Sequence, residues 1–248
     1  MNPSEIIYGR NPVREALRGR RRVRRVWVLP GRVREDLSAE VASWAAAAGV
    51  AAPPVSARSP EELVVAAGSP DHQGMVAEVD PYPYASSDLI LREFTLVVAL
   101  DRIQDPHNLG AIVRTAEVAG AAVVIPRHRT AAITAAVVKA SAGATEHAAV
   151  GLVRNLTDFL VGAKDAGFWI YGADVAAASA YDVQDYRGKT VFVVGSEGEG
   201  LGRRVAQACD VLVSIPQLGR VGSLNVSVSA GVLLFEALRQ RRVGERGP

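Results

Sequence analysis

The sequence predicts an α/β protein in two parts, a small α/β domain followed by a larger α/β domain with a parallel sheet. From Phe94 onward, runs of Val and Ile alternate with helical stretches, as expected for strands buried on both faces of a parallel sheet. The first 80 residues alternate helical and extended patterns on a smaller scale. Between them, "DPYPYASSD" (80–88) is polar and proline-rich. We therefore expect domains over 1–80 and 93–248, joined by a linker over 81–92.

The first domain carries the start signals of three helices. Asn11 stands before Pro12, and Ser38 and Ser59 are further N-cap candidates, with Pro60 following Ser59. Two stretches with alternating apolar residues, "VRRVWVL" and "QGMVAEV", are typical of strands. The expected helices run from Asn11 to Gly19, from Ser38 to Gly49 and over 59–67, and the expected strands cover 23–29 and 73–79.

The second domain has five apolar stretches that predict strands, and the last of them leads into an apolar helix over 226–240. The expected strands cover 95–100, 121–126, 168–173, 190–195 and 210–216. In parallel sheets of this kind, ligands bind at the carboxyl ends of the strands. Polar motifs that directly follow these strands are therefore the candidates for a functional site.

Composition excludes several other classes of protein. No apolar run approaches the ~20 residues that span a bilayer. The N-terminal "MNPSEIIYGR" lacks the basic and apolar regions of a secretory signal. Cys209 is the single cysteine, and the four histidines (72, 107, 128 and 147) lack the spacing of a zinc site. We expect a soluble, cytoplasmic protein with no metal and no membrane association.

Positive charge is concentrated near the N-terminus, although the net charge of the chain is only +2. Ten arginines and one acid, Glu15, lie between Gly9 and Arg34. A local basic stretch of this kind binds phosphates. A GC-rich genome explains why these residues are Arg rather than Lys, but it does not explain their clustering. The alternative is that these arginines form a solvent-exposed surface that does not contact nucleic acid. The predicted RNA contacts are Arg10, Arg20, Arg21, Arg22, Arg24 and Arg25, with Arg20 to Arg22 in the loop before strand 23–29 favoured.

The first polar motif is "LDRIQDPHNLGAIVRTAEVAG" (100–120), which follows the first strand of the second domain. Arg114 lies six residues after Asn108, so the two can face one crevice at the strand end. Taken alone, Asn108 is equally readable as an N-cap and Arg114 as a surface residue.

The second motif, "VVGSEGEGLGRRV" (193–205), is a glycine-rich turn after a strand. It lacks the Lys-Ser/Thr of a P-loop and does not match the dinucleotide fingerprint. Glu197 and Glu199 would repel a pyrophosphate, so an uncharged or cationic ligand suits the turn better. A tight turn that needs positive φ is the purely structural alternative.

The third motif, "GRVGSLNVSVSAG" (219–231), places four polar residues at the joint between a strand and an apolar helix. Ser223 or Asn225 can cap the helix, and Ser227 and Ser229 can bond back to carbonyls within it. One of Ser223 and Asn225 is then left for a ligand.

Together the three motifs closely resemble the signature motifs of the SpoU, or TrmH-like, RNA ribose 2′-O-methyltransferases. The resemblance covers the chain from about Leu96 to Arg241. The N-terminal "IYGRNPVREAL" and "HQGMVAEV" are similar to the substrate-binding domain of the RlmB-type branch, which methylates a guanosine of 23S rRNA.

The resemblance implies a SPOUT-type α/β catalytic domain with a trefoil knot, preceded by a ribosomal-protein-like RNA-binding domain. It implies a homodimer that binds S-adenosylmethionine in the knot and RNA as substrate. By position, the implied cofactor contacts are Gly195, Ile215 and Leu224. The implied catalytic residues are Asn108, Arg114, Glu197, Ser223 and Asn225. Arg114 would act either as a general base or as a phosphate clamp, and the sequence leaves both roles open.

Other functions stay open from the sequence. Within the same family, the chain could modify tRNA or confer antibiotic resistance by modifying rRNA. A catalytically inactive RNA-binding homologue is disfavoured by the presence of Asn108, Arg114 and Asn225. A dinucleotide-dependent oxidoreductase would need an early glycine-rich fingerprint, which the chain lacks.

Overall fold

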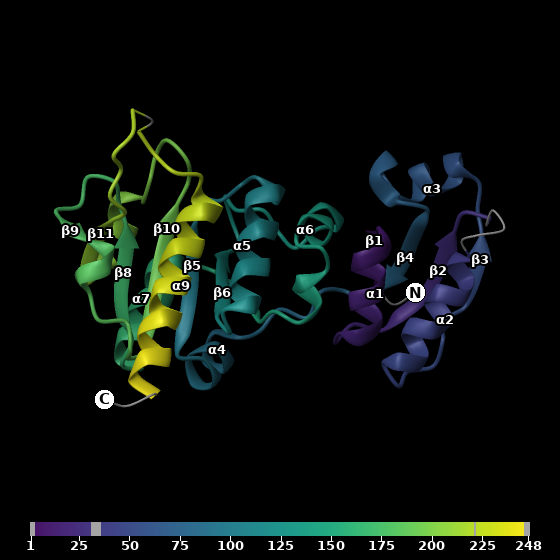
Figure 1. Cartoon of the computed structure of the whole chain (residues 1–248), viewed down its shortest axis with the longest axis horizontal. Coiled ribbons are helices and arrows are strands. Elements are labelled where there is room, and N and C mark those ends of the chain that lie inside the picture. The colour runs from purple at the N-terminus through teal and green to yellow at the C-terminus, as the bar shows by residue number, and fades with distance from the viewer. Residues whose placement is uncertain (1–2, 31–35, 221, 246–248) are drawn as a thin grey trace. The chain divides into compact units, whose positions relative to one another are not determined.

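The computed structural model describes residues 3–30, 36–220 and 222–245, and its elements form two compact units (Figure 1). The small unit comprises Met1–Pro83 and Ile133–His147, and the large unit comprises Tyr84–Ala132 and Ala148–Pro248. Segment 133–147, which we placed in the second domain, therefore makes its contacts within the small unit. Arg32 and Arg34 of the predicted arginine cluster lie outside the described residues.

The small unit is built on a four-stranded sheet with the order β1-β4-β2-β3. Its strands are β1 (Glu5–Tyr8), β2 (Val23–Val28), β3 (Val55–Ala57) and β4 (Met75–Val79). Its helices are α1 (Arg10–Arg18), α2 (Leu37–Ala47), α3 (Pro60–Ala67), α6 (Ala135–Ala140) and the 3₁₀ turns η1 (Pro70–His72) and η2 (Ala144–Glu146). The α/β character of this part and the two strands expected in it are confirmed. Strand β1 was not predicted, because four residues carry too little alternation to be recognised.

Two of the three helix starts differ from the predicted ones. Helix α1 begins after Gly9, which has a φ of 99° and provides no side-chain cap, so Asn11 lies inside the helix. Helix α2 is capped by Asp36, whose Oδ1 accepts from the amides of Ser38 at 3.0 Å and Ala39 at 3.1 Å. The carboxylate two residues upstream is therefore the cap of α2, and the prediction of Ser38 was wrong.

The large unit contains a seven-stranded sheet with the order β7-β6-β5-β10-β8-β11-β9, and every neighbouring pair is parallel. Its strands are β5 (Leu96–Asp101), β6 (Ala122–Pro126), β7 (Val150–Val153), β8 (Trp169–Ala173), β9 (Ser179–Ala180), β10 (Thr190–Gly195) and β11 (Val211–Ser214). Its helices are α4 (Ser87–Glu93), α5 (Pro106–Val118), α7 (Leu156–Asp165), α8 (Arg203–Ala208), α9 (Val226–Glu245) and the 3₁₀ turn η3 (Tyr181–Val183). The parallel sheet and its five expected strands are confirmed.

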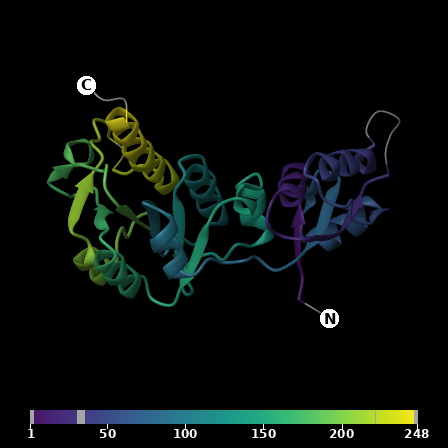
Figure 2. The same cartoon turned by 90° about the horizontal axis from the view of Figure 1, so that it is seen from below.

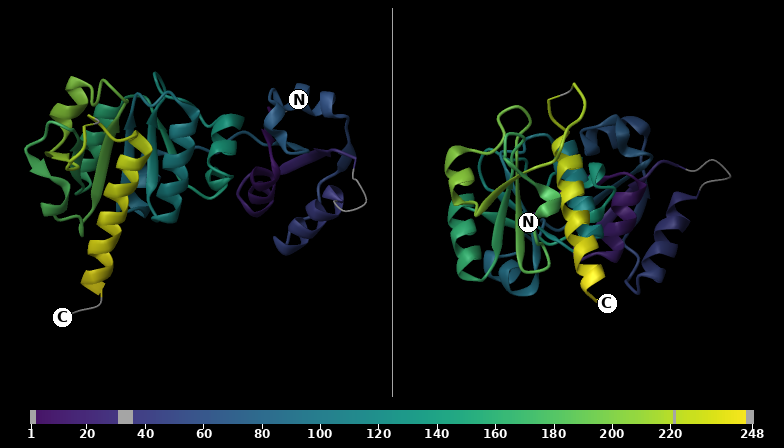
Figure 3. Two further views of the ribbon diagram at one scale, coloured as in Figure 1. Left: turned by 45° about the horizontal axis from the view of Figure 1, so that its top comes forward. Right: turned by 60° about the vertical axis from the view of Figure 1, so that its left-hand side comes forward.

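Helices cover both faces of this sheet, as Figure 2 shows. Helices α5 and α9 lie side by side on one face (Figures 1 and 3). Side chains of α4, α7 and α8 pack with alternate strand residues in a core on the other face. Strand β5 is buried along its whole length, including Asp101, a residue that is 6% exposed. Strands β5 and β10 are neighbours in the middle of the sheet, with further strands on both sides.

The predicted linker over 81–92 is shorter in the structure, because α4 occupies its second half. Ser86 caps α4 by accepting from the amide of Leu89 at 3.2 Å. Ile90 is fully buried in the core of the large unit. The polar and proline-rich composition of this segment indicated a linker, whereas the buried side chain of Ile90 attaches a short helix to the sheet.

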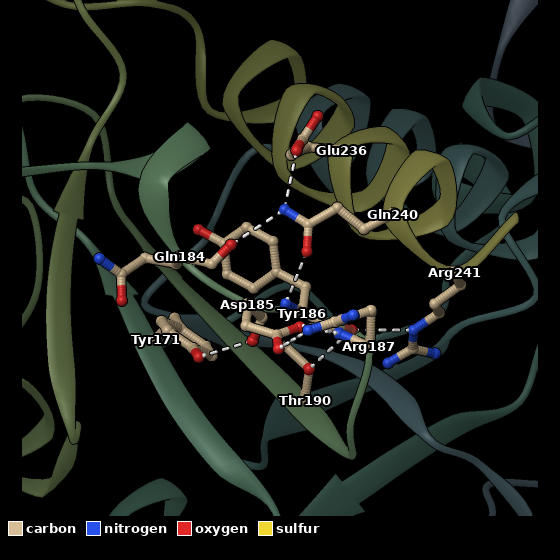
Figure 4. A network of polar contacts seen from close by, with 9 residues as sticks. All are labelled: Tyr171, Gln184, Asp185, Tyr186, Arg187, Thr190, Glu236, Gln240 and Arg241. Carbon is tan, nitrogen blue, oxygen red and sulfur yellow. Dashed lines mark hydrogen bonds and ion pairs between the residues drawn. The ribbon is translucent and has the colours of Figure 1, made fainter. Parts of the chain in front are cut away.

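A polar network at the amino edge of the sheet fastens the C-terminal half of α9 (Figure 4). Gln240 accepts from the amide of Tyr186 at 2.8 Å and donates to the carbonyl of Gln184 at 2.9 Å. Arg241 donates to the carbonyls of Tyr186 at 3.0 Å, Gly188 at 2.7 Å and Thr95 at 3.0 Å. The N-terminal end of α9 is thereby held at the opposite, carboxyl edge of the sheet.

Candidate active site at the carboxyl edge of the large sheet

A pocket of ≈ 260 Å³ lies at the carboxyl ends of β8, β10 and β11, next to the start of α9. Asp174 lines it after β8, Gly195 and Glu197 after β10, and Ile215 after β11. Ser223 and Leu224, which precede α9, complete the lining on that side. All three predicted cofactor contacts, Gly195, Ile215 and Leu224, therefore lie around one pocket. Asp174 was not predicted, because no motif marks the end of β8.

The glycine-rich segment after β10 folds back sharply on itself. Its turn is closed by a hydrogen bond of 2.9 Å from the amide of Gly200 to the carbonyl of Ser196. Gly198 and Gly200 have φ values of 87° and 62°, which favour glycine. A side chain at Gly195 would collide with the carbonyl of Gly200. Glycine at position 195 thus lets the backbone itself form a wall of the pocket.

Two residues at the end of β5 hold this glycine-rich segment in place. Asp101 accepts from the amide of Gly202 at 2.6 Å. Arg102 donates to the carbonyl of Gly200 at 3.1 Å and forms an ion pair with Glu199. Sequence reasoning missed both residues, although they open the first polar motif. Of the two glutamates in this segment, Glu199 is therefore paired with Arg102, whereas Glu197 lines the pocket.

Three predicted catalytic residues, one from each motif, form a hydrogen-bonded cluster beside the pocket. Oε1 of Glu197 accepts from Asn225 Nδ2 at 2.7 Å and from Asn108 Nδ2 at 3.2 Å. Asn225 Nδ2 also lies 2.8 Å from Asn108 Oδ1. The amide of Val226, at the start of α9, donates to the same Glu197 oxygen at 3.3 Å. The positive end of the α9 dipole therefore faces this carboxylate.

Asn225 also caps α9, so both ends of its side-chain amide are in use. Its Oδ1 accepts from the amide of Ser227 at 2.9 Å. Ser229 bonds back to the carbonyl of Asn225 at 3.3 Å, as predicted. The hydroxyl of Ser227 instead bonds to the Asn225 side chain at 2.5 Å, because Ser227 is the second residue of α9 and no turn of the helix precedes it. Ser223, which does not cap the helix, is exposed on the pocket wall.

Arg114 lies apart from this cluster in the structure. It is exposed on α5, roughly 9 Å along the helix axis from Asn108 at 1.5 Å per residue. Within the described residues, no hydrogen bond joins it to Asn108, Glu197 or Asn225. Asn108 and Arg114 were expected to face one crevice, and in the structure no hydrogen bond joins these two described side chains.

The predicted RNA contact at Arg21 is wrong, because this side chain is buried. Only 1% of it is exposed, and its Nε donates to Glu146 at 2.9 Å. Its Nη1 forms an ion pair with Glu5 at 2.9 Å, and its guanidinium lies 5.4 Å from the ring centre of Tyr82. Glu146 is 125 residues away in the sequence, so charge clustering alone could not reveal this pair.

The other predicted RNA contacts differ in their surroundings. Arg10 pairs with Glu40, Arg24 with Asp80 at 2.7 Å, and Arg25 with Glu78 at 2.5 Å. Arg20 and Arg22 are exposed in the segment between α1 and β2. Together with Arg24 they line a groove of ≈ 450 Å³ in the small unit. This groove is where the small unit presents several arginine side chains together.

The part of the chain that the structure describes contains no group of three or more His, Cys, Asp and Glu side chains able to hold a metal ion. Cys209 stands alone, and burial raises the pKa of its thiol to about 12. In the same part of the chain, no helix is both long and apolar enough to cross a bilayer.

Comparison with known proteins follows the division seen in the structure. A sequence model of the SpoU rRNA Methylase family matches residues 95–235. The chain belongs to this family. A second family model, described as RNA 2′-O ribose methyltransferase substrate binding, matches residues 6–85. The chain is thus an RNA methyltransferase of the SpoU type with an attached substrate-binding part.

Two curated SpoU-type relatives match almost the whole chain. A TrmH family tRNA/rRNA methyltransferase of Bacillus subtilis is 37% identical over 97% of this chain and 98% of its own length. An uncharacterized tRNA/rRNA methyltransferase of Mycolicibacterium vanbaalenii is 43% identical over 96% of this chain and 77% of its own length.

Solved structures of other methyltransferases have the same fold. An AdoMet-bound rRNA methyltransferase from Sinorhizobium meliloti superposes with a TM-score of 0.78 at 28% identity, covering 95% of this chain and 87% of that one. The SpoU methyltransferase AviRb from Streptomyces viridochromogenes, in complex with AdoMet, gives the same TM-score of 0.78 at 24% identity, covering 97% and 92%. The second comparison concerns the fold alone.

Proposed function

We propose that this SpoU-type protein transfers a methyl group from S-adenosylmethionine to a ribose 2′-hydroxyl of RNA, and that the target is a guanosine of 23S rRNA. The observation that carries the proposal is the Asn108–Glu197–Asn225 cluster on the wall of a pocket at the carboxyl edge of the sheet. The structure of the Sinorhizobium relative with AdoMet bound supports the choice of cofactor.

The pocket fits S-adenosylmethionine in chemistry. Ile215 and Leu224 offer apolar contacts, and the backbone around Gly195 offers amides and carbonyls at close range. Glu197 and Asp174 place negative charge on the lining, which suits a cationic sulfonium and not a phosphate. The bound group supplies a methyl carbon that is already activated for transfer.

The side chains of the cluster position the acceptor ribose. Asn108 and Asn225 both donate to Oε1 of Glu197, which fixes the orientation of that carboxylate. Its other oxygen, Oε2, makes no hydrogen bond to a described residue and can accept from a ribose hydroxyl. Ser223 is a second polar contact from the pocket wall. Correct alignment of the 2′-oxygen removes much of the entropic part of the barrier.

Arg114 acts in this proposal as a phosphate clamp beside the target ribose. A guanidinium stays protonated at neutral pH, so it is a poor general base. Its exposure on α5 leaves it accessible to an RNA phosphate. A positive charge near the target hydroxyl favours loss of the hydroxyl proton.

The small unit binds the RNA outside the active site, in keeping with the substrate-binding family model that it matches. We assign this role to the groove lined by Arg20, Arg22 and Arg24, with the exposed Arg25 and the half-buried Arg10 at other positions of the small unit. Arg21 is not included, because its buried guanidinium is ion-paired with Glu5 and Glu146.

We further propose that the segment from β11 to α9 is threaded into a trefoil knot and that the protein is a homodimer. Apolar side chains on the outer side of α5 and α9 support the dimer. Val118 is 64% exposed, Val228 50% and Phe235 47%. A second copy packed on this face would remove these side chains from water.

Mapping 2′-O-methyl groups in RNA from cells with and without the gene tests the proposed function. The proposal predicts that one guanosine of 23S rRNA loses its ribose methyl group when the gene is absent. Loss of a methyl from tRNA instead would move the substrate to tRNA. Unchanged ribose methylation throughout the cellular RNA would contradict the proposal.

A further inference from the structure

Arginines at the two edges of the large sheet differ in their ion pairing. Near the amino edge, Arg92 pairs with Glu93 at 2.8 Å, Arg187 with Asp185 at 2.6 Å, and Arg239 with Glu236 at 2.8 Å. At the carboxyl edge, Arg102 is paired in the same way. Five further arginines at this edge are exposed, and their side chains have no hydrogen bond or ion pair to any described residue. They are Arg127, Arg129, Arg154, Arg203 and Arg204.

Three of these arginines follow the neighbouring strands β6 and β7. Pro126 and Val153 are partners in the parallel pairing, and the amide of Arg127 donates to the carbonyl of Val153 at 2.8 Å. Arg127 and Arg154 are therefore adjacent, with backbones roughly 5 Å apart at the usual spacing of strands. Arg129 lies two residues further along the turn, with a φ of 62°. We call Arg127, Arg129 and Arg154 the β6–β7 arginines.

The surroundings of the β6–β7 arginines add to their positive charge. Like charges on adjacent strands repel one another. Helix α7 begins directly after Arg154, capped by Asn155, so the positive end of its dipole is at the same place. Asp158 lies in the first turn of α7. None of the three arginine side chains forms an ion pair with it or with any other described carboxylate, so all three are available to an external anion.

The strand order puts the β6–β7 arginines on one side of the catalytic cluster and the pocket on the other. In the order β7-β6-β5-β10-β8-β11-β9, Asn108 follows β5, which is the neighbour of the central strand β10. Strands β6 and β7 lie on one side of β5, and the pocket lies at β10, β8 and β11 on the other side. The distance from β5 to β7 is about 10 Å, or two strand spacings. A polyanion bound there reaches the cluster without crossing the pocket.

We propose that Arg127, Arg129 and Arg154 bind backbone phosphates of the substrate RNA next to the target nucleotide. This inference rests on the proposed function and adds the path of the RNA strand across the catalytic sheet. Guanidinium groups bind phosphate with paired hydrogen bonds, and such contacts position a strand without reading its sequence. Three side chains spread over two strand ends suit successive phosphates of a strand better than one free phosphate ion.

The test is RNA binding by the double variant Arg127→Gln/Arg154→Gln in the full-length protein, with unmodified 23S rRNA transcribed in vitro as the probe. Each phosphate contact that is lost lowers the slope of log affinity against log salt by ~0.7, so we expect a decrease of about 1.4. If both proteins bind equally at 1 M salt, the variant binds about 25-fold more weakly than wild type at 0.1 M salt. Binding of S-adenosylmethionine, measured by calorimetry, should not change.

The matched control is Arg92→Gln/Arg187→Gln, which removes the same charge from exposed ion pairs at the amino edge. It should keep the wild-type salt slope. The inference is overturned if the β6–β7 variant keeps the wild-type slope, or if both variants lower it equally, since only net charge would then matter. Failure of the proposed function is a separate result, seen as absent methyl transfer by the wild-type protein on the same RNA.

Discussion

At the scale of single residues, Asn225 joins the structural and catalytic parts of the site. Its Oδ1 caps α9, while its Nδ2 bonds to Glu197 and Asn108. The sequence indicated that either Ser223 or Asn225 caps the helix and that the other is left for a ligand. The structure shows that an amide can do both, because its two ends serve different partners.

Asn225→Ala is expected to lower stability slightly and methyl transfer strongly. Loss of an N-cap costs about 1 kcal/mol, which lowers Tm by ~2–4 °C in a chain of this size. The control is Ser59→Ala, which removes the capping box of α3 in the small unit. Both variants should unfold at similar temperatures in thermal denaturation. Equal transfer rates in the two variants would show that Asn225 is only a cap.

Cys209 is expected to be unreactive in the native protein. Burial raises the pKa of its thiol from 9.0 to about 12, so very little thiolate exists at pH 8. Because the folded-state pKa is the higher one, the resulting stabilisation is full below pH 9 and is lost as the pH rises toward 12. Mass spectrometry after iodoacetamide treatment at pH 8 should find Cys209 unlabelled when folded and labelled in urea. Rapid labelling of the folded protein would contradict this account.

At the scale of elements, local signals predicted most strands and helices, although two helix starts differ, and they could not indicate contacts between distant residues. The Ser59 cap of α3 was predictable because both halves of the capping box lie within four residues. Strand β7 was missed because four residues around Gly151 carry little pattern. The burial of Arg21 depends on Glu146, which no local pattern near Arg21 can indicate.

Arg241→Ala is expected to loosen α9, since the helix loses its hydrogen bonds to three backbone carbonyls at the amino edge. Removing charged hydrogen bonds of this kind costs ~1.5–3 kcal/mol. Arg239→Ala is the control, because Arg239 is exposed and its one ion pair among the described residues is with Glu236 on the same helix. Urea denaturation should show a lower midpoint for Arg241→Ala alone. Equal midpoints would mean that the network of Figure 4 does not hold α9.

At the scale of the whole molecule, the strand order explains why three distant motifs meet. Asn108 and Asn225 are 117 residues apart, yet β5 and β10 are neighbours and α9 starts beside them. The rule that ligands bind at the carboxyl ends of parallel strands predicted this meeting from the sequence. The position of Arg114 and the contacts of Asp101 and Arg102 with the glycine-rich segment depend on how side chains pack. A sequence motif does not indicate such packing.

RNA binding by the small unit is expected to depend on Arg20 and Arg22. Arg20→Ala/Arg22→Ala should lower the slope of log affinity against log salt by ~1.4–1.8, since two phosphate contacts are lost. Arg21→Ala should instead destabilise the protein by ~3–5 kcal/mol, because Glu146 is left buried without its partner. Filter binding at several salt concentrations, with urea denaturation alongside, separates the two effects. If the double variant keeps the wild-type dependence of RNA affinity on salt, the arginine cluster is a solvent-exposed surface that does not contact RNA.

The central claim is that the cluster of Asn108, Glu197 and Asn225 directs methyl transfer to a ribose hydroxyl. The most direct measurement incubates the protein with methyl-labelled S-adenosylmethionine and unmodified 23S rRNA, digests the RNA to nucleosides and separates them by chromatography. The label should appear in 2′-O-methylguanosine and should be lost with Asn108→Ala, while that variant still binds the cofactor. Label on a nucleobase, or full transfer by Asn108→Ala, would contradict the account.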